Sequence, residues 1–240
     1  ALKGIMISLL MVDHMIEGHM LPPRMHEKWQ TFATYSTDTF MMLFRVFING
    51  GALSYLVALG FALALLVHRR REQGWTENQI SRYLVVRGGI LVVLNLTLEN
   101  WLWAIIYDAP IYSFGILSAI GISMIMLGFI VRFGTKAVLG AGVLAYALVY
   151  AFMLWLRVDV MVPQYHVDKI ASLNLLHYLT VVPGYTATWG ANYAFLPWFA
   201  FSCAGYGAGR WFLCNQKQAL NWFPWIAAVM FILGLLWQAT

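Results

Sequence analysis

The sequence predicts an all-α protein, a polytopic transmembrane helix bundle of about seven spans that forms one domain over residues 1–240. Of its residues, 61% are hydrophobic and 10% are charged, whereas soluble domains carry about 25% charged residues. Apolar runs, most of them long enough to cross a bilayer as a helix, alternate with shorter polar segments. The net charge of +5 comes from basic residues between these runs, so it does not indicate a nucleic-acid partner.

The first predicted span, residues 1–21, is mostly apolar but contains Lys3, Asp13, His14 and Glu17. A charged side chain at mid-membrane costs about 2.5–3.5 kcal/mol on insertion scales, so partner helices or a wet cavity must satisfy these groups. On a helix, Lys3, His14 and Glu17 share one face. This face is predicted to be the wall of an intramembrane site. The structural alternative is a buried His14–Glu17 pair that fixes helix packing.

Further spans follow from the same pattern of hydropathy. They are predicted at about residues 40–67, 83–106, 112–131, 136–156, 191–212 and 223–240. Two longer connections are expected at about 22–39 and 157–190, and the middle of the second, 171–182, is predicted to form a short helix. Pro197 and Pro224 are expected in the first turns of the last two spans, where proline is tolerated.

The distribution of Lys and Arg predicts the orientation. The connection at 68–82 is the most basic of the chain, and basic connections remain on the cytoplasmic side. The N-terminus is then cytoplasmic, and the connections at 22–39 and 157–190 are extracytoplasmic. We expect an integral protein of a bacterial cytoplasmic (inner) membrane, with membrane lipid as a partner.

This orientation gathers polar residues in the outer halves of three consecutive spans. Arg45 and Asn49 lie in the second span, and Asn95, Glu99 and Asn100 lie in the third. Together with the polar residues of the first span they form a predicted cluster of both charges. The structural alternative is an ion pair between Arg45 and Glu99.

Two basic residues are expected near the inner surface. Lys3 and Arg87 are placed to meet anionic lipid or a phosphorylated ligand. The alternative for both is ordinary snorkelling to the membrane surface.

The glycines and cysteines predict helix packing and the absence of a disulfide. Gly205 and Gly209 have the spacing that favours close helix packing. Cys203 and Cys214, eleven residues apart on one helix, are separated by about 16 Å, so no mutual disulfide is expected. No Cys/His spacing matches a metal motif, and no metal is expected.

Five stretches in order resemble the family of transmembrane acyltransferases that includes heparan-alpha-glucosaminide N-acetyltransferase and its bacterial relatives. They are LKGIMISLLMVDH (2–14), RVFINGGALSYLVALGFALAL (45–65), YLVVRGGILVVLNLTLENW (83–101), ILSAIGISMIMLGFIVRF (116–133) and YAFLPWFAFSCAGYGAGRWF (193–212). The resemblance covers nearly the whole chain. It implies transfer of an acetyl or other acyl group from cytoplasmic acyl-CoA to the amine or hydroxyl of an extracytoplasmic glycan or lipid-linked sugar.

The resemblance also implies roles for the polar residues. His14 would be the general base or transient acyl carrier, and Glu17 would orient it. The expected acceptor-binding residues are Arg45, Asn49, Asn95 and Glu99, and the expected donor-binding residues are Lys3 and Arg87.

The sequence also departs from the family pattern. Lys3 stands where the family usually has arginine, which binds phosphate with a planar fork, and Asn49 stands where it often has histidine. Relatives continue beyond the sixth span with several more helices, so this is expected to be a shortened or partly covered member. The alternative function is therefore a non-catalytic accessory or scaffold subunit of a larger membrane complex; a homo-oligomer is also compatible. A small-solute transporter is disfavoured because no inverted repeat is visible.

Overall fold

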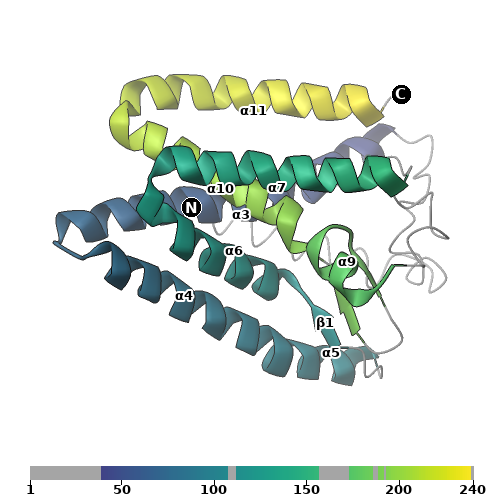
Figure 1. Ribbon diagram of the computed structural model, residues 1–240. Coiled ribbons are helices and arrows are strands. Elements are labelled where there is room, and N and C mark those ends of the chain that lie inside the picture. Colours follow the sequence, from purple (N-terminus) through teal and green to yellow (C-terminus); the bar gives the residue numbers. More distant parts are fainter. Residues whose placement is uncertain (1–38, 108–111, 157–172, 186–188, 192, 239–240) are drawn as a thin grey trace. The chain divides into compact units, whose positions relative to one another are not determined.

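The computed structural model describes residues 39–107, 112–156, 173–185, 189–191 and 193–238 (Figure 1). Most of these residues are helical. The longer helices are α3 (Thr39–Glu72), α4 (Glu77–Leu94), α6 (Ile116–Ile130), α7 (Thr135–Leu156), α10 (Phe195–Cys214) and α11 (Gln216–Gln238). The chain forms two compact units, residues 56–213 and residues 1–55 with 214–240, and each is considered by itself.

Three helical segments are long and apolar enough to cross a membrane. They are Glu77–Leu102, Ile116–Phe133 and Thr135–Leu156. A mostly helical integral membrane protein is therefore confirmed. The number of seven spans and the cytoplasmic N-terminus stay predictions, and the first predicted span lies outside the described residues.

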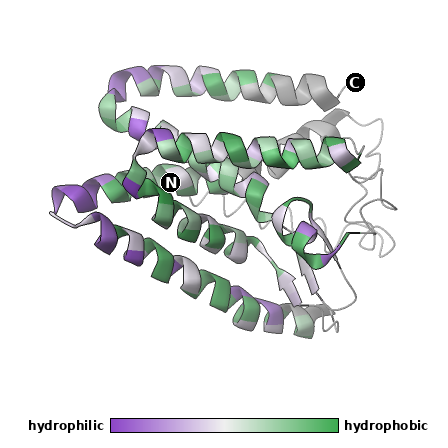
Figure 2. Cartoon of the chain, in the orientation of Figure 1, coloured by the Kyte–Doolittle hydropathy of each residue, from purple (hydrophilic) through white to green (hydrophobic). Residues whose placement is uncertain are grey.

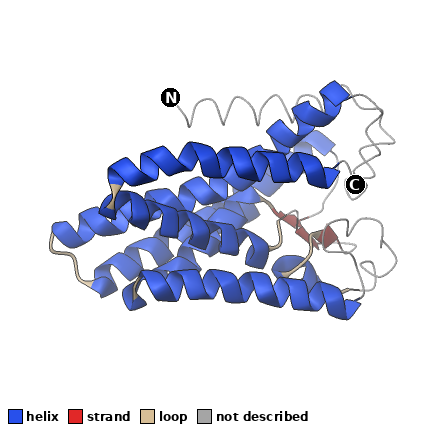
Figure 3. Cartoon of the chain, turned by 90° about the horizontal axis from the view of Figure 1, so that it is seen from above, coloured by secondary structure: helices blue, strands red, loops and turns tan. Residues whose placement is uncertain are grey.

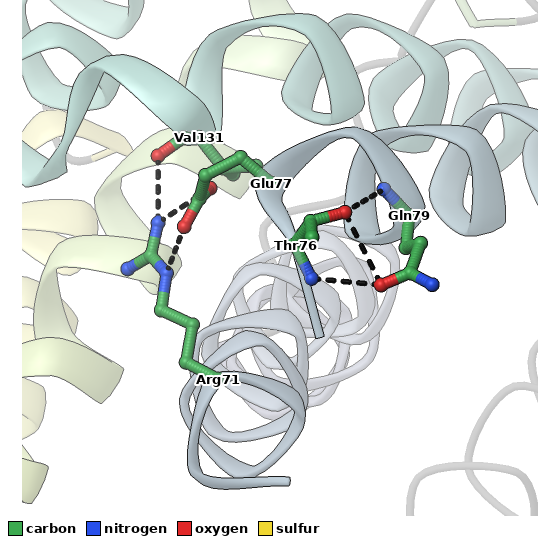
Figure 4. A network of polar contacts seen from close by, with 5 residues as sticks. All are labelled: Arg71, Thr76, Glu77, Gln79 and Val131. Carbon is green, nitrogen blue, oxygen red and sulfur yellow. Dashed lines mark hydrogen bonds and ion pairs between the residues drawn. The ribbon is translucent and has the colours of Figure 1, made fainter. Parts of the chain in front are cut away.

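The start of α4 is fixed by side chains of the connection before it (Figure 4). Thr76 and Gln79 form a reciprocal capping box, in which each side chain accepts a hydrogen bond from the other residue's backbone N–H. Arg71 donates to both carboxylate oxygens of Glu77, at 2.7 and 3.0 Å, and to the carbonyl oxygen of Val131 at 3.1 Å. The hydrogen bond with Glu77 raises the pKa of Arg71 above its ordinary value, so this guanidinium stays charged. The network joins the end of α3, the start of α4 and the end of α6.

Helices α4 and α6 approach closely through glycines. A Cβ on Gly88 would overlap the carbonyl oxygen of Gly121, and a Cβ on Gly121 would approach the carbonyl oxygen of Gly88 equally closely. Gly128 packs in the same way against Leu84 and Ser81. Close backbone contact of this kind replaces the hydrophobic driving force that is missing between helices in lipid.

Helix α10 packs against residues 56–72 of α3 by the same principle. A Cβ on Gly205 would overlap the carbonyl oxygen of Val57, and one on Gly209 would lie 2.8 Å from the carbonyl oxygen of Phe61. On the α3 side, Gly60 lies against the backbone of α10. The predicted close packing at Gly205 and Gly209 is confirmed. Cys203, on the same helix, is buried, Cys214 is exposed, and both thiols are free.

A small sheet at one end of residues 56–213 was not predicted (red in Figure 3). Its strands are β1 (Tyr112–Phe114), β2 (Gly184–Tyr185) and β3 (Trp189–Ala191). The central strand β3 pairs in parallel with β1 and antiparallel with β2. The short helix α9 (Leu175–Thr180) lies beside it, as predicted for 171–182. The all-α expectation is therefore correct for most of the described chain but incomplete.

The spanning helices are mostly apolar along their length, whereas hydrophilic residues gather where α3 meets α4 (Figure 2). On α7, Val143 and Trp155 are 71% and 73% exposed, while Val138, Val149 and Met153 are buried. An apolar face of this size is typical of contact with lipid.

Several predicted helix ends are wrong. The third span starts at Glu77, six residues before the predicted Tyr83, because the capping box fixes its start. Residues Tyr112–Phe114 and Trp189–Ala191 are strands, so α6 and α10 start later than predicted. Helix α11 already starts at Gln216, and Pro224 lies inside it rather than in its first turn.

Candidate functional site: a polar cluster at the end of α4

A π-helical turn, Asn95–Glu99, separates α4 from α5 (Asn100–Tyr107). Such a turn inserts an extra residue and often occurs at functional sites. Here it lies about 27 Å along the helix from Glu77, close to the thickness of a bilayer core. The turn places two polar residues, Asn95 and Asn100, among buried groups. We refer to Asn95, Glu99, Asn100, Ser113 and Ser118 as the polar cluster.

Asn95 is completely buried and holds the start of α6. Its Oδ1 accepts hydrogen bonds from the backbone N–H groups of Gly115 (2.7 Å) and Ser118 (3.2 Å). Its Nδ2 donates to the carbonyl oxygen of Ser113 at 3.1 Å. Gly115, the N-cap residue of α6, has no side chain to satisfy these donors, so Asn95 supplies the cap from another helix.

Asn100 lies one turn further along and is 4% exposed. Its Oδ1 accepts from the backbone N–H of Ser113 at 3.0 Å and from the Ser113 hydroxyl at 3.3 Å. Its Nδ2 is buried and has no hydrogen-bond partner among the residues that the structure describes. A buried donor without a partner costs about 1–3 kcal/mol, so this amide is a candidate for donating a hydrogen bond to a ligand.

The Glu99 carboxylate lies against Gly115. A Cβ at position 115 would overlap Glu99 Oε1, so glycine leaves the space that the carboxylate occupies. The backbone of Gly115 has φ −84°, which any residue adopts, so space rather than conformation requires glycine here. Glu99 and Asn100, consecutive residues of the chain, thus place a carboxylate against Gly115 and an amide against Ser113.

Replacing Asn95 by alanine is expected to lower the free energy of unfolding by about 3 kcal/mol, because two N–H groups and one carbonyl lose their buried partner. Thermal unfolding of the purified protein in detergent measures the effect. Thr97→Ala, on an exposed position of the same π-helical turn, is the control and should change stability by less than about 0.5 kcal/mol. Equal losses in the two variants would contradict the capping role of Asn95.

The structure tests the placement of only some predicted site residues. Asn95 and Glu99 both lie against Gly115, and Asn100 contacts Ser113. The role of Asn95 and Glu99 in binding the acceptor stays a prediction. Arg45 and Asn49 lie on α3, but their side chains are outside the described residues, so neither the predicted Arg45–Glu99 pair nor a role for Asn49 is tested. His14, Glu17 and Lys3 also lie outside the described residues.

Arg87 lies on a different part of α4 from the polar cluster. It is exposed, and its guanidinium Cζ lies 4.8 Å from the centre of the Tyr83 ring. Eight residues separate it from Asn95, about 12 Å along the helix. Within the described ranges, no three His, Cys, Asp or Glu residues are grouped to hold a metal ion.

Sequence analysis missed Ser113 and Ser118 as members of the polar cluster. The available signal was their position: both flank Gly115 at the start of an otherwise apolar run. Their pairing with Asn95 and Asn100 over 13 to 23 residues could not be read from local spacing.

Comparison with known proteins identifies a family. The sequence model described as "Heparan-alpha-glucosaminide N-acetyltransferase, catalytic" matches residues 14–236 of this chain. The match includes the whole polar cluster and indicates an acetyltransferase-like membrane function. No curated protein and no solved structure shows a significant match to the chain.

Proposed function

Because the chain belongs to the heparan-alpha-glucosaminide N-acetyltransferase catalytic family, we propose that it transfers an acetyl group from acetyl-CoA across the membrane to a sugar. The donor would bind at the basic end, near the connection between α3 and α4. The acceptor, an amine or hydroxyl of a glycan or lipid-linked sugar, would bind at the polar cluster. The membrane would be a bacterial cytoplasmic membrane, with the basic end inside.

The observation that carries this proposal is the buried amide of Asn100 beside Glu99. A sugar offers many hydroxyl groups that both donate and accept hydrogen bonds. The Asn100 Nδ2 can donate to one of them, and the Glu99 carboxylate can accept from another or from an amine.

The two ends of the helical segment that contains α4 differ in charge, which supports binding of the donor at one end and of the acceptor at the other. The segment Glu77–Leu102 is 26 residues long and apolar enough to cross a bilayer. Its first end adjoins the basic connection, and its other end carries Asn95, Glu99 and Asn100. A cationic end suits the phosphates of acetyl-CoA, and a polar end without excess positive charge suits a neutral or cationic sugar.

In the proposed reaction, the acceptor nitrogen or oxygen attacks the thioester carbonyl carbon and the carbon–sulfur bond breaks. His14 takes the proton of the attacking group and returns it to the departing CoA thiolate. Glu17 orients the imidazole. In the alternative path, the acetyl group rests on His14 before it passes to the acceptor. Lys3 would contact donor phosphate, and Arg45 and Asn49 would help to position the acceptor.

Calorimetric titration of the purified protein with acetyl-CoA tests the donor half of the proposal. Binding in the micromolar range that Lys3→Ala weakens about tenfold is the expected result, because a cation–phosphate contact contributes about this factor. Absence of binding to a folded sample would contradict it. The second candidate function is a non-catalytic accessory subunit. It is favoured by Lys3 and Asn49, which stand where the family usually has arginine and often has histidine, and absence of acetyl-CoA binding would support it.

Asn100→Ala is expected to lower kcat/KM for the acceptor about 10- to 100-fold, the usual effect of one lost hydrogen bond at a buried site. KM for acetyl-CoA should not change. Ser123→Ala is the matched control, since Ser123 is an equally buried polar residue of α6 outside the polar cluster. Acetyl-transfer assays at varied acceptor concentration measure both variants. If Asn100→Ala matched the wild type, the acceptor site would lie elsewhere.

A further inference from the structure

Four side chains form an arginine–aromatic cluster where α3 ends and α4 begins: Arg70, Trp75, Tyr83 and Arg87. The Arg70 Cζ lies 4.2 Å from the centre of the Trp75 ring and 5.4 Å from that of Tyr83. The Arg87 Cζ lies 4.8 Å from the same Tyr83 ring. The two rings meet edge to face at 5.8 Å. Two guanidinium groups are thus held on one aromatic pair by cation–π contacts.

Arg87 belongs to the outward, apolar face of α4. Its neighbours Val86 and Ile90 are 51% and 54% exposed, whereas Gly88 is buried against α6. Arg87 stands ten residues into the helix, about 15 Å from Glu77. An arginine on a lipid-facing surface extends along the helix toward the headgroups. The Arg87 side chain contacts Tyr83, which lies one turn closer to the basic end, so it extends toward that end of the helix.

The positive charge of this region exceeds its negative charge. Residues 68–87 contain five arginines and two glutamates. Glu77 is bound to Arg71, and Glu72 faces His68 at 3.3 Å. Among the residues that the structure describes, Arg70 and Arg87 have no acidic partner. An anion near either guanidinium group would therefore be favoured.

We propose that the arginine–aromatic cluster binds the phosphate headgroup of an anionic phospholipid. The guanidinium groups would contact the phosphate oxygens, for which arginine has the matching donor geometry. Trp75 and Tyr83 are of the types that anchor at the level of the headgroups. Acyl chains would lie along the apolar face that includes Val86 and Ile90.

A lipid is favoured over a water-soluble phosphate because of where Arg87 lies. Its neighbours on the outward face are aliphatic, and this face offers them no protein cover among the described helices. Because this face contacts the bilayer, the anion nearest to Arg87 is the headgroup of an adjacent lipid, whose acyl chains cover the aliphatic residues. The cluster lies at the same basic end as the proposed donor site, and Arg87 was predicted to bind the donor, so the experiment below must separate the two ligands.

Native mass spectrometry of the delipidated protein in detergent tests the proposal. The sample is titrated with short-chain phosphatidylglycerol and, separately, with phosphatidylcholine. The wild type should bind phosphatidylglycerol more tightly. Arg87→Gln should weaken this binding about fivefold, the contribution of one basic residue at an anionic surface, and should leave phosphatidylcholine unaffected. Arg87→Lys, which keeps the charge but not the planar donor geometry, should restore only part of the affinity.

The matched control is Arg69→Gln. Arg69 is exposed and adjacent to Arg70, and its removal changes the net charge equally. Equal weakening by Arg69→Gln and Arg87→Gln would overturn the proposal, because net charge alone would then explain lipid binding. Titration of the same variants with acetyl-CoA tests the alternative that the cluster binds the donor. If Arg87→Gln weakened only acetyl-CoA binding, the cluster would be a donor site rather than a lipid site.

Discussion

Replacing His14 by alanine is expected to reduce acetyl transfer by about 100- to 10,000-fold, the range that a general base contributes. The expectation follows from the proposed chemistry, in which one imidazole accepts the proton of the sugar and returns it to the CoA thiolate. The protein should still fold and bind acetyl-CoA, because His14 acts on the attacking group. Transfer of labelled acetyl from acetyl-CoA to an amino sugar measures the loss.

His19→Ala is the control for this experiment. It removes an imidazole from the same predicted span but from a residue to which no role is assigned. Its activity should stay within about twofold of the wild type. Full activity of His14→Ala would refute the catalytic assignment, and equal losses in both variants would indicate damage to the first span rather than to the chemistry.

Gly205→Ala is expected to destabilise the protein as strongly as Asn95→Ala, with a loss of about 3 kcal/mol in the free energy of unfolding. The added methyl would overlap the backbone carbonyl oxygen of Val57, and backbone atoms cannot rotate away as a side chain does. The contact would have to open between α10 and α3, and the neighbouring contact of Gly60 with α10 would open with it. Thermal unfolding in detergent measures the change.

Gly140→Ala is the corresponding control. Gly140 lies in α7, and a Cβ there would meet nothing within 4 Å. Alanine has the higher helix propensity, so this variant should be as stable as the wild type or more stable by up to about 1 kcal/mol. If Gly205→Ala were equally harmless, the α3–α10 contact would not be as close as described.

The sequence predicted the helices better than their ends. Hydropathy alone located the described spans, because a bilayer imposes a minimum length on apolar helices. The ends depend on polar chemistry that hydropathy ignores. Thr76 and Gln79 start α4 within a polar stretch of low hydropathy. Pro224 predicts a helix start but lies inside α11, which begins at Gln216.

The small sheet and the π-helical turn illustrate a different limit. Strand β1 has three residues, and its partner β3 is 77 residues away in the register Tyr112 to Trp189. No local pattern encodes such a pairing. A π-turn at Asn95–Glu99 likewise resembles any other helical sequence, because the extra residue is stabilised by tertiary contacts.

At the candidate site, the sequence identified polar residues but not their individual roles. Asn95 and Glu99 are predicted site residues because they are polar and stand near the end of an apolar run, and both lie against Gly115. The amide of Asn95, however, is occupied by the backbone of α6 on both its oxygen and its nitrogen. Asn100, which received no separate role, carries the buried donor. Distinguishing the two required the position of α6.

The most direct test of acetyl transfer uses the purified protein in liposomes with labelled acetyl-CoA and a panel of amino sugars and lipid-linked sugars. We expect that at least one sugar becomes acetylated, with equal release of CoA thiol, and that Asn100→Ala slows this reaction by raising the acceptor concentration it requires. Failure of a folded, acetyl-CoA-binding sample to acetylate any sugar in such a panel would contradict the proposed transfer.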